Sequence, residues 1–158
     1  MEKKDIILEV VPEYILTKRT GSTLVYKVKK EKIKRSEDIN RFSRQFYSDD
    51  IGIYESFFII ITNRVNVPIA WMKISQGGVS GTVVDIKLIA RYAIEHLGSS
   101  VILVHNHPSG NLIPSDADRN ITRKIKNGLK TLDIELLDHI ILSPEDDKYF
   151  SFADEGIL

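Results

Sequence analysis

The fold is organised around the stretch Val101-Ile-Leu-Val-His105-Asn-His107-Pro-Ser-Gly110. Its first four residues are apolar and predict a buried β-strand. Histidines follow at positions 105 and 107, and side chains two residues apart in an extended backbone point to the same side. Two imidazoles at the end of one strand can therefore reach the same metal ion.

The residues that follow this strand supply a third ligand. A proline and a glycine end the strand, and Ser115 then has the position of an N-cap at the start of a helix. Asp118 would lie in the first helical turn, facing back toward the loop. Two histidines and one carboxylate leave the fourth tetrahedral position open, as in catalytic zinc sites. The residue types therefore predict Zn²⁺ bound by His105, His107 and Asp118.

Ser115 and Asp118 also have a purely structural interpretation. The pattern Ser-x-x-Asp resembles a capping box, although the third position is usually Glu or Gln. Both interpretations can hold, because capping fixes the first helical turn and so places the carboxylate. The Ser115 hydroxyl is in addition a candidate to stabilise the oxyanion of a tetrahedral intermediate.

A metal-bound water needs a base, and Glu55 is the candidate. It opens the stretch Tyr54-Glu-Ser-Phe-Phe-Ile-Ile-Ile-Thr62, which is nearly all apolar after the glutamate and predicts a central strand. A carboxylate beside such an apolar surface is partly desolvated, which favours proton exchange near neutral pH. The alternative is a solvated residue at a strand end, and the residues alone leave both open.

Two further polar segments have competing interpretations. Asp138 and His139 lie inside an apolar run, either as a pair that orients a ligand histidine or as a satisfied polar pair within the sheet. The second interpretation is favoured. Residues 29–35 hold five basic side chains in seven. A solvated edge is favoured there over a small docking patch for anions.

Composition restricts the class of protein. The chain has 158 residues, 42% hydrophobic and 28% charged, which predicts one globular domain. With 22 basic and 22 acidic residues, the net charge does not favour nucleic acid or a membrane surface as a partner. Cysteine is absent, which excludes disulfides, thiolate catalysis and cysteine zinc ligands. No apolar run approaches about 20 residues and no signal peptide begins the chain, so a cytoplasmic protein is expected.

Apolar spacing predicts the order of the elements. Three helices are predicted to begin at the capping residues Ser36, Asp85 and Ser115. Strands precede, separate and follow them, which predicts a mixed α/β or α+β domain. A turn is expected at residues 20–22. The predicted strands cover residues 5–11, 23–29, 54–62, 69–75, 101–104, 134–142 and 148–152.

Helical spacing also predicts which residues of these helices face the core. Gly98 is expected to end the second helix. The predicted core positions are Ile39, Phe42 and Phe46 in the first helix, Leu88, Ile89, Tyr92, Ala93 and Leu97 in the second, and Ala117, Ile121, Ile125 and Leu129 in the third.

The metal motif resembles that of a known family. His105-x-His107-Pro, six residues, and then Ser115-x-x-Asp118 is similar to the JAMM signature of JAB/MPN metalloproteins. The sequence from His105 to Asp118 resembles the RadC branch of that group. Two later segments share this resemblance, Leu137-Asp-His-Ile-Ile141 and Tyr149-Phe-Ser-Phe-Ala-Asp-Glu-Gly156.

The resemblance covers residues 36–158 and implies the JAB/MPN (cytidine-deaminase-like) architecture, a curved mixed sheet flanked by helices. Residues 1–35 then form an N-terminal β extension. It implies that the His, His, Asp set holds zinc, and that Glu55 is the upstream base. Longer RadC proteins carry a helical, helix-hairpin-helix-like segment in front. Residues 1–35 instead predict strands, which puts DNA binding by that route in doubt.

The function implied by the resemblance is hydrolysis. A zinc-activated water would cleave an amide or isopeptide bond of a protein or peptide substrate, with Glu55 and Ser115 as catalytic residues. The alternative is a non-catalytic MPN-like scaffold or an accessory protein in DNA processing, since the RadC family is associated by name with DNA repair. The substrate, partners and oligomeric state are not specified by the sequence.

Overall fold

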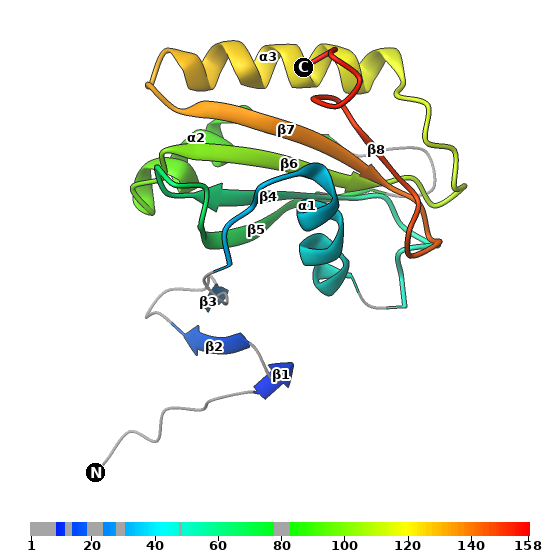
Figure 1. Cartoon of the computed structure of the whole chain (residues 1–158), viewed down its shortest axis with the longest axis horizontal. Helices are drawn as coiled ribbons and strands as arrows, with labels where there is room; N and C mark the ends of the chain where they lie inside the picture. The colour runs from blue at the N-terminus through cyan, green and yellow to red at the C-terminus, as the bar shows by residue number, and fades with distance from the viewer. Residues whose placement is uncertain (1–8, 12–13, 19–23, 28–30, 48, 78–82) are drawn as a thin grey trace.

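The computed structural model describes the chain except for residues 1–8, 12–13, 19–23, 28–30, 48 and 78–82 (Figure 1). At its centre is a five-stranded sheet with the strand order β5-β4-β6-β7-β8. All neighbouring strands are antiparallel except β6 and β7, which run parallel. The strands are β4 (Ser56–Thr62), β5 (Pro68–Gln76), β6 (Ser100–Asn106), β7 (Glu135–Leu142) and β8 (Tyr149–Ser151).

Helices cover both faces of this sheet. Helix α1 (Ser36–Ser43), continued by the 3-10 helix η1 (Arg44–Phe46), lies on one face, and α2 (Ile86–Glu95) and α3 (Asp116–Lys130) lie on the other (Figure 1). The crossover from β6 through α3 to β7 makes the parallel pair. The predicted mixed sheet flanked by helices is thus confirmed. No helix in the described part of the chain is long and apolar enough to cross a membrane.

Each face of the sheet has its own hydrophobic core, because alternate residues of a strand point to opposite sides. Toward α2 and α3, β6 presents Val101 and Leu103, and toward α1 it presents Ile102 and Val104. The α1 face is richer in aromatic side chains, and Phe46 stacks on Trp71 with ring centroids 4.2 Å apart. The fully buried strands β4 and β6 account for the nearly continuous apolar runs in the sequence.

Strand β6 extends past the predicted residues 101–104 and includes His105 and Asn106. Alternation therefore places His105 on the α2 and α3 face and Asn106 on the α1 face. Antiparallel pairing of β4 with β6 sets Phe57 opposite His105, and their rings stack with an interplanar angle of 12°. This end of the sheet is where the chemistry-bearing residues gather.

The N-terminal segment forms a separate antiparallel sheet with the order β1-β2-β3. Strands β1 (Glu9–Val11) and β3 (Leu24–Lys27) lie within predicted strands, whereas β2 (Tyr14–Lys18) was not predicted. The predicted turn at residues 20–22 lies outside the described residues. The boundary at residue 35 between an extension and a domain stays a prediction.

The predicted N-cap at Ser36 is wrong. Helix α1 begins with Ser36 itself, after an extended Arg35, and the Asp38 carboxylate accepts from the backbone N–H of Arg35 at 3.2 Å. The Ser36 hydroxyl instead lies 3.0 Å from the Tyr149 hydroxyl and donates to Asp154. These partners lie more than a hundred residues away, so local sequence could not reveal that the serine is used in tertiary packing.

Two predicted core positions are also wrong. Leu97 is 87% exposed and takes the left-handed conformation with φ of 52°. Leu97, and not the predicted Gly98, thus has the backbone conformation that a helix-ending glycine usually adopts. Gly98 follows it and packs so closely on β4 that an added Cβ would overlap the Ile61 side chain. Ala117 is exposed in the first turn of α3, and Thr122 is buried instead.

Candidate metal centre

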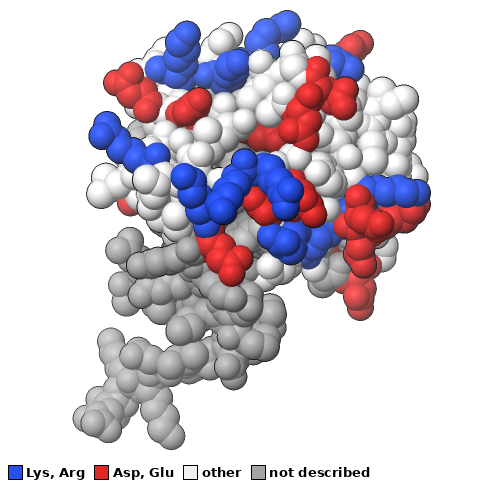
Figure 2. Space-filling view, viewed as in Figure 1, with Lys and Arg blue, Asp and Glu red and all other residues white. Residues whose placement is uncertain are grey.

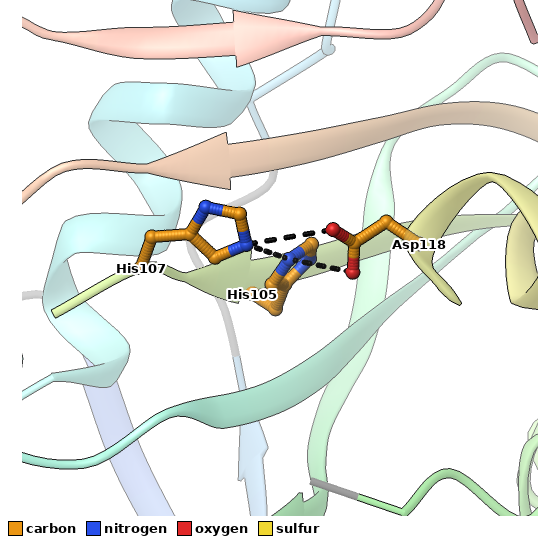
Figure 3. Close-up of side chains that lie close together, drawn as sticks. All are labelled: His105, His107 and Asp118. Carbon is orange, nitrogen blue, oxygen red and sulfur yellow. Dashed lines mark hydrogen bonds and ion pairs between the residues drawn. The ribbon is translucent and has the colours of Figure 1, made fainter. Parts of the chain in front are cut away.

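Three side chains converge at the end of β6, as Figure 3 shows. His105 is the penultimate residue of the strand, His107 follows the strand, and Asp118 lies in the first turn of α3. The two Nε2 atoms are 3.0 Å apart. Asp118 Oδ1 lies 3.3 Å from His105 Nε2, and Asp118 Oδ2 lies 3.5 Å from His107 Nε2. The structure therefore brings together the three residues that the sequence predicts as metal ligands.

Backbone hydrogen bonds fix the loop that carries His107. The His107 N–H donates to the Leu142 carbonyl at 2.9 Å, which keeps His107 against β7 beyond the end of β6. Gly110 then turns the chain with φ of 76°, a conformation suited to glycine. Its N–H donates to the His107 carbonyl at 2.9 Å. The loop is thus folded tightly back on the strand that carries the histidines.

A capping box at the start of α3 positions the carboxylate. As predicted, Ser115 is the N-cap, and its Oγ accepts from the Asp118 N–H at 3.1 Å. Asp118 Oδ2 in return accepts from the Ser115 N–H at 2.7 Å and from the Ser115 hydroxyl at 2.6 Å. The structural and functional interpretations of this pair are therefore compatible, since the bonds that cap the helix also orient Asp118 toward the histidines.

The remaining ring nitrogens of both histidines have partners of their own. His107 Nδ1 lies 2.5 Å from the Asn111 carbonyl, and a carbonyl only accepts, so this nitrogen carries the proton. His105 Nδ1 lies 2.8 Å from His139 Nε2. Each imidazole is thus held through its Nδ1 atom, and its Nε2 atom points into the cluster.

This donor set fits a divalent metal ion. Bonds of about 2.0–2.1 Å from a tetrahedral zinc to nitrogen or oxygen imply ligand atoms about 3.3 Å apart, close to the 3.0, 3.3 and 3.5 Å found here. Two imidazole nitrogens and a carboxylate suit zinc among the common metals. The three residues could hold a metal ion with a fourth position open to water or substrate.

Electrostatics in the cluster favour a cation. Burial alone disfavours a charged Asp118, but its close polar contacts with His105, His107 and Ser115 hold the pKa of its carboxyl well below the usual range. Burial opposes protonation of His107, yet Asp118, the Asn111 carbonyl and Glu55 raise its pKa above the ordinary value. Asp118 is therefore a carboxylate at neutral pH, and a metal ion would replace the proton that His107 otherwise attracts.

Glu55 lies beside this cluster. It immediately precedes β4 and is half-buried. Since Phe57 pairs with His105, alternation points Glu55 to the same face of the sheet, next to His107. Its negative charge contributes to the raised pKa of His107. Glu55 is thus within electrostatic reach of the centre, which is the position that its predicted role as a base requires.

Asn106 fixes the backbone on both sides of Glu55. Its Oδ1 accepts from the Ser56 N–H at 2.8 Å, and its Nδ2 donates to the carbonyls of Ile51 at 2.6 Å and Tyr54 at 2.8 Å. The residue between the two ligand histidines therefore ties the segment that carries Glu55 to the metal strand. Sequence analysis gave this asparagine no role.

Ser115 lies at the edge of the centre with its hydroxyl already used. The hydroxyl proton points to Asp118 Oδ2 and the oxygen accepts from the Asp118 N–H. Stabilising an oxyanion would require this hydroxyl to turn from the carboxylate toward substrate. Its role as a cap is clear, while its catalytic role stays a prediction.

Asp138 and His139 have separate roles because they point to opposite faces of β7. Asp138 is buried, which raises its pKa, and it accepts from the Ser151 hydroxyl and from the backbone of His139 and Ala153. It matches the favoured interpretation of a satisfied polar group. His139 follows the alternative, because its Nε2 meets the ligand His105.

Thr122 also belongs to the surroundings of the site and was missed by sequence analysis. It is 3% exposed, and its hydroxyl lies 2.6 Å from His139 Nδ1. The available signal was its position in the helical stripe of Asp118, Thr122, Ile125 and Leu129, where apolar spacing alone predicts a hydrophobic residue.

The basic segment at residues 29–35 does not form a uniform patch in the part that the structure describes. Lys32, Lys34 and Arg35 are exposed, but Arg35 pairs with Glu37 at 3.3 Å. Figure 2 shows basic and acidic side chains interleaved over the face seen in Figure 1. This mixture favours the interpretation of a solvated edge over that of an anion-binding patch.

Comparison with known proteins agrees with this geometry. Residues 33–157 match the family described as RadC-like JAB domain. A UPF0758 protein of Flavobacterium johnsoniae is 44% identical over 105 residues, 66% of this chain and 45% of that protein. A UPF0758 protein of Porphyromonas gingivalis is 41% identical over 104 residues, 66% of this chain and 45% of that protein. One from Streptococcus sanguinis is 34% identical over 128 residues, 81% and 55% of the two chains.

The chain spans about half the length of these relatives. The family match covers most of the chain and includes all three converging side chains and Glu55. The segment before residue 33 lies outside that match. This protein therefore belongs to the RadC-like JAB domain family.

Proposed function

We propose that this protein is a zinc-dependent hydrolase of the JAMM type that cleaves an amide or isopeptide bond in a protein or peptide. The observation that carries the proposal is the convergence of His105, His107 and Asp118, with ligand atoms within 4.8 Å of one another. Membership of the JAB family supports it. The absence of cysteine in the sequence supports action in a reducing compartment such as the cytoplasm.

The chain's own residues would divide the work. His105, His107 and Asp118 would hold the metal, which when bound polarises a carbonyl and lowers the pKa of water. Glu55 would accept the proton of the attacking water and return it to the leaving amine. Ser115 would donate its hydroxyl to the developing oxyanion. Asn106 would keep the segment around Glu55 in register with the ligand strand.

The first experiment measures metal content. The purified protein should hold about one zinc per chain, and Asp118→Ala should lose it while keeping its fold by circular dichroism. Asp116→Ala is the matched control, since Asp116 is an exposed acid in the same helical turn and is not part of the cluster. Equal zinc content in both variants would contradict the proposed ligand set.

The second experiment separates hydrolysis from a scaffold role. A library of fluorogenic peptides and isopeptide-linked peptides is the probe. Glu55→Gln should keep zinc and lose cleavage, because the amide cannot accept the proton. Full cleavage by zinc-free wild type, or undiminished cleavage by Glu55→Gln, would rule out the mechanism. The intact donor set favours the hydrolase over the non-catalytic scaffold. If the protein is a scaffold, its biological role should be unchanged in Glu55→Gln.

A further inference from the structure

We propose that His139 and Thr122 are positioning residues that fix the tautomer of His105, so that its Nε2 faces the metal position as a bare lone pair. The inference deepens the proposed function and rests on it for the identity of the metal. It is carried by a chain of three hydrogen bonds that links one ligand to another through residues outside the JAMM motif.

The chain of bonds crosses three elements. His105 Nδ1 on β6 meets His139 Nε2 on β7 at 2.8 Å. His139 Nδ1 meets the Thr122 hydroxyl on α3 at 2.6 Å. Thr122 Oγ1 then donates to the backbone carbonyl of Asp118 at 2.5 Å. The path begins at one ligand and ends at the backbone of a second.

The hydrogen bond from Thr122 to the Asp118 carbonyl determines the direction of the other two. A carbonyl can only accept, so the Thr122 proton is committed to Asp118. Thr122 Oγ1 must then accept from His139 Nδ1–H. A neutral His139 has no second proton, so its Nε2 accepts from His105 Nδ1–H. His105 therefore keeps no proton on Nε2, which is the form that binds a metal ion.

The surroundings of His139 keep it neutral. It is completely buried, with its ring stacked on Phe152 at 4.7 Å between centroids and tilted against Phe57. Complete burial between these aromatic rings disfavours the charged imidazolium form. An imidazolium would donate from both nitrogens and would force His105 to present the wrong tautomer.

The two ligand histidines are thus oriented by different means. His107 is fixed locally, by the Asn111 carbonyl four residues away in the same loop. His105 is fixed by side chains from two other elements. By contrast His96, outside the site, uses Nδ1 to contact the carbonyl of Tyr92 in its own helix. Both ring nitrogens of His139 have partners, and these partners come from two other elements.

Ring-nitrogen NMR of protein labelled with ¹⁵N-histidine, recorded without metal, tests the tautomer directly. Wild type should show His105 and His139 protonated on Nδ1. Thr122→Val keeps the shape of the side chain but removes the hydroxyl, so His139 and with it His105 should become mixtures of tautomers. Thr122→Ser should restore the wild-type pattern. Thr62→Val is the control, because this buried hydroxyl has no hydrogen-bond partner in the described part of the chain.

Zinc affinity, measured by competition with a chelator, gives the second readout. Thr122→Val should weaken zinc binding by about 10-fold to 100-fold, whereas Thr122→Ser and Thr62→Val should bind like wild type. An Nε2-protonated His105 in wild type, or wild-type tautomers and affinity in Thr122→Val, would overturn the inference. A wild type that shows the expected tautomers but binds no zinc would instead overturn the proposed function. The two failures are therefore distinguishable.

Discussion

Near the candidate metal centre, the polar residues of β6 and β7 have different roles on the two faces of the sheet. On the α1 side, Asn106 and Asp138 make three hydrogen bonds each and serve as internal connectors. On the α2 and α3 side, His105, His107 and Asp118 direct atoms at one another. Satisfied polar groups on one face are structural, and converging ligand atoms on the other indicate a binding site.

The difference is produced by single-residue steps in sequence. Asn106 lies between the two ligand histidines, and Asp138 directly precedes His139. Because neighbouring residues of a strand point to opposite faces, one residue of each pair lies on the α1 face and the other lies on the face of the metal centre. Proximity in sequence to a ligand is therefore a poor guide to function unless the strand alternation is known.

The largest expected effect is on the free energy of unfolding, for a substitution on the α1 face of the sheet. Phe58 is 1% exposed and packs among Phe46, Tyr47 and Trp71 on the α1 face. Phe58→Ala should lower the free energy of unfolding by about 3–5 kcal/mol, since it leaves a cavity. Urea unfolding of metal-free protein measures this, with Phe58→Leu as a milder control. The folded variant should bind zinc as wild type does, and a large loss of affinity would mean that the faces are coupled.

A smaller effect is expected at Asn106. Asn106→Leu leaves one N–H and two carbonyls near Glu55 without their partner and should cost about 3 kcal/mol in the free energy of unfolding. Zinc content should stay unchanged, because the residue faces away from the ligands. Asn120→Leu, at an exposed position on α3, is the control. Loss of zinc from folded Asn106→Leu would break the proposed division between faces.

The dependence of stability on pH tests the opposite face. His139 has a lowered pKa in the folded protein, so the unfolded chain binds more protons below about pH 6.5 and stability falls as the pH is lowered. Between about pH 6.5 and about pH 5, metal-free wild type should therefore lose more stability than His139→Gln does. Chemical unfolding at several pH values measures this. The same pH dependence in both proteins would show that His139 is not held neutral.

The smallest effect concerns the capping box. Ser115→Ala removes the acceptor for the Asp118 N–H and should lower the free energy of unfolding by about 1 kcal/mol. Ser115→Asn should retain most of the stability, since asparagine is an equally good N-cap. Zinc should remain bound to both variants because the three ligands are intact. A loss of zinc from Ser115→Ala would show that the cap, and not only the carboxylate, is needed to hold the metal.

Much of this arrangement followed from spacing in the sequence. The i, i+2 histidines and the N-cap at Ser115 were sufficient to predict that His105, His107 and Asp118 converge. Strands β4 and β6 were identifiable because continuous apolar runs are typical of strands buried on both sides. These features depend on local backbone geometry, which neighbouring residues largely determine.

The errors arose where distant contacts decide the outcome. Ser36 bonds to residues more than a hundred positions away instead of capping its helix. After the end of α2, Gly98 packs closely on Ile61 of β4, a residue far away in sequence, and the preceding Leu97 is exposed. Thr122 occupies a position that helical spacing assigns to the core, and its partner His139 lies on another element.

By itself, the sequence determined which residues can bind a metal ion and on which local structures they lie, because strand alternation and helix capping act over a few residues. Only the tertiary structure decided that His139 and Thr122 support His105 while Asp138 and Asn106 stabilise the opposite side. The physical reason is that hydrogen bonds between elements depend on the register of β6 with β7 and on the packing of α3, which are set by the whole fold.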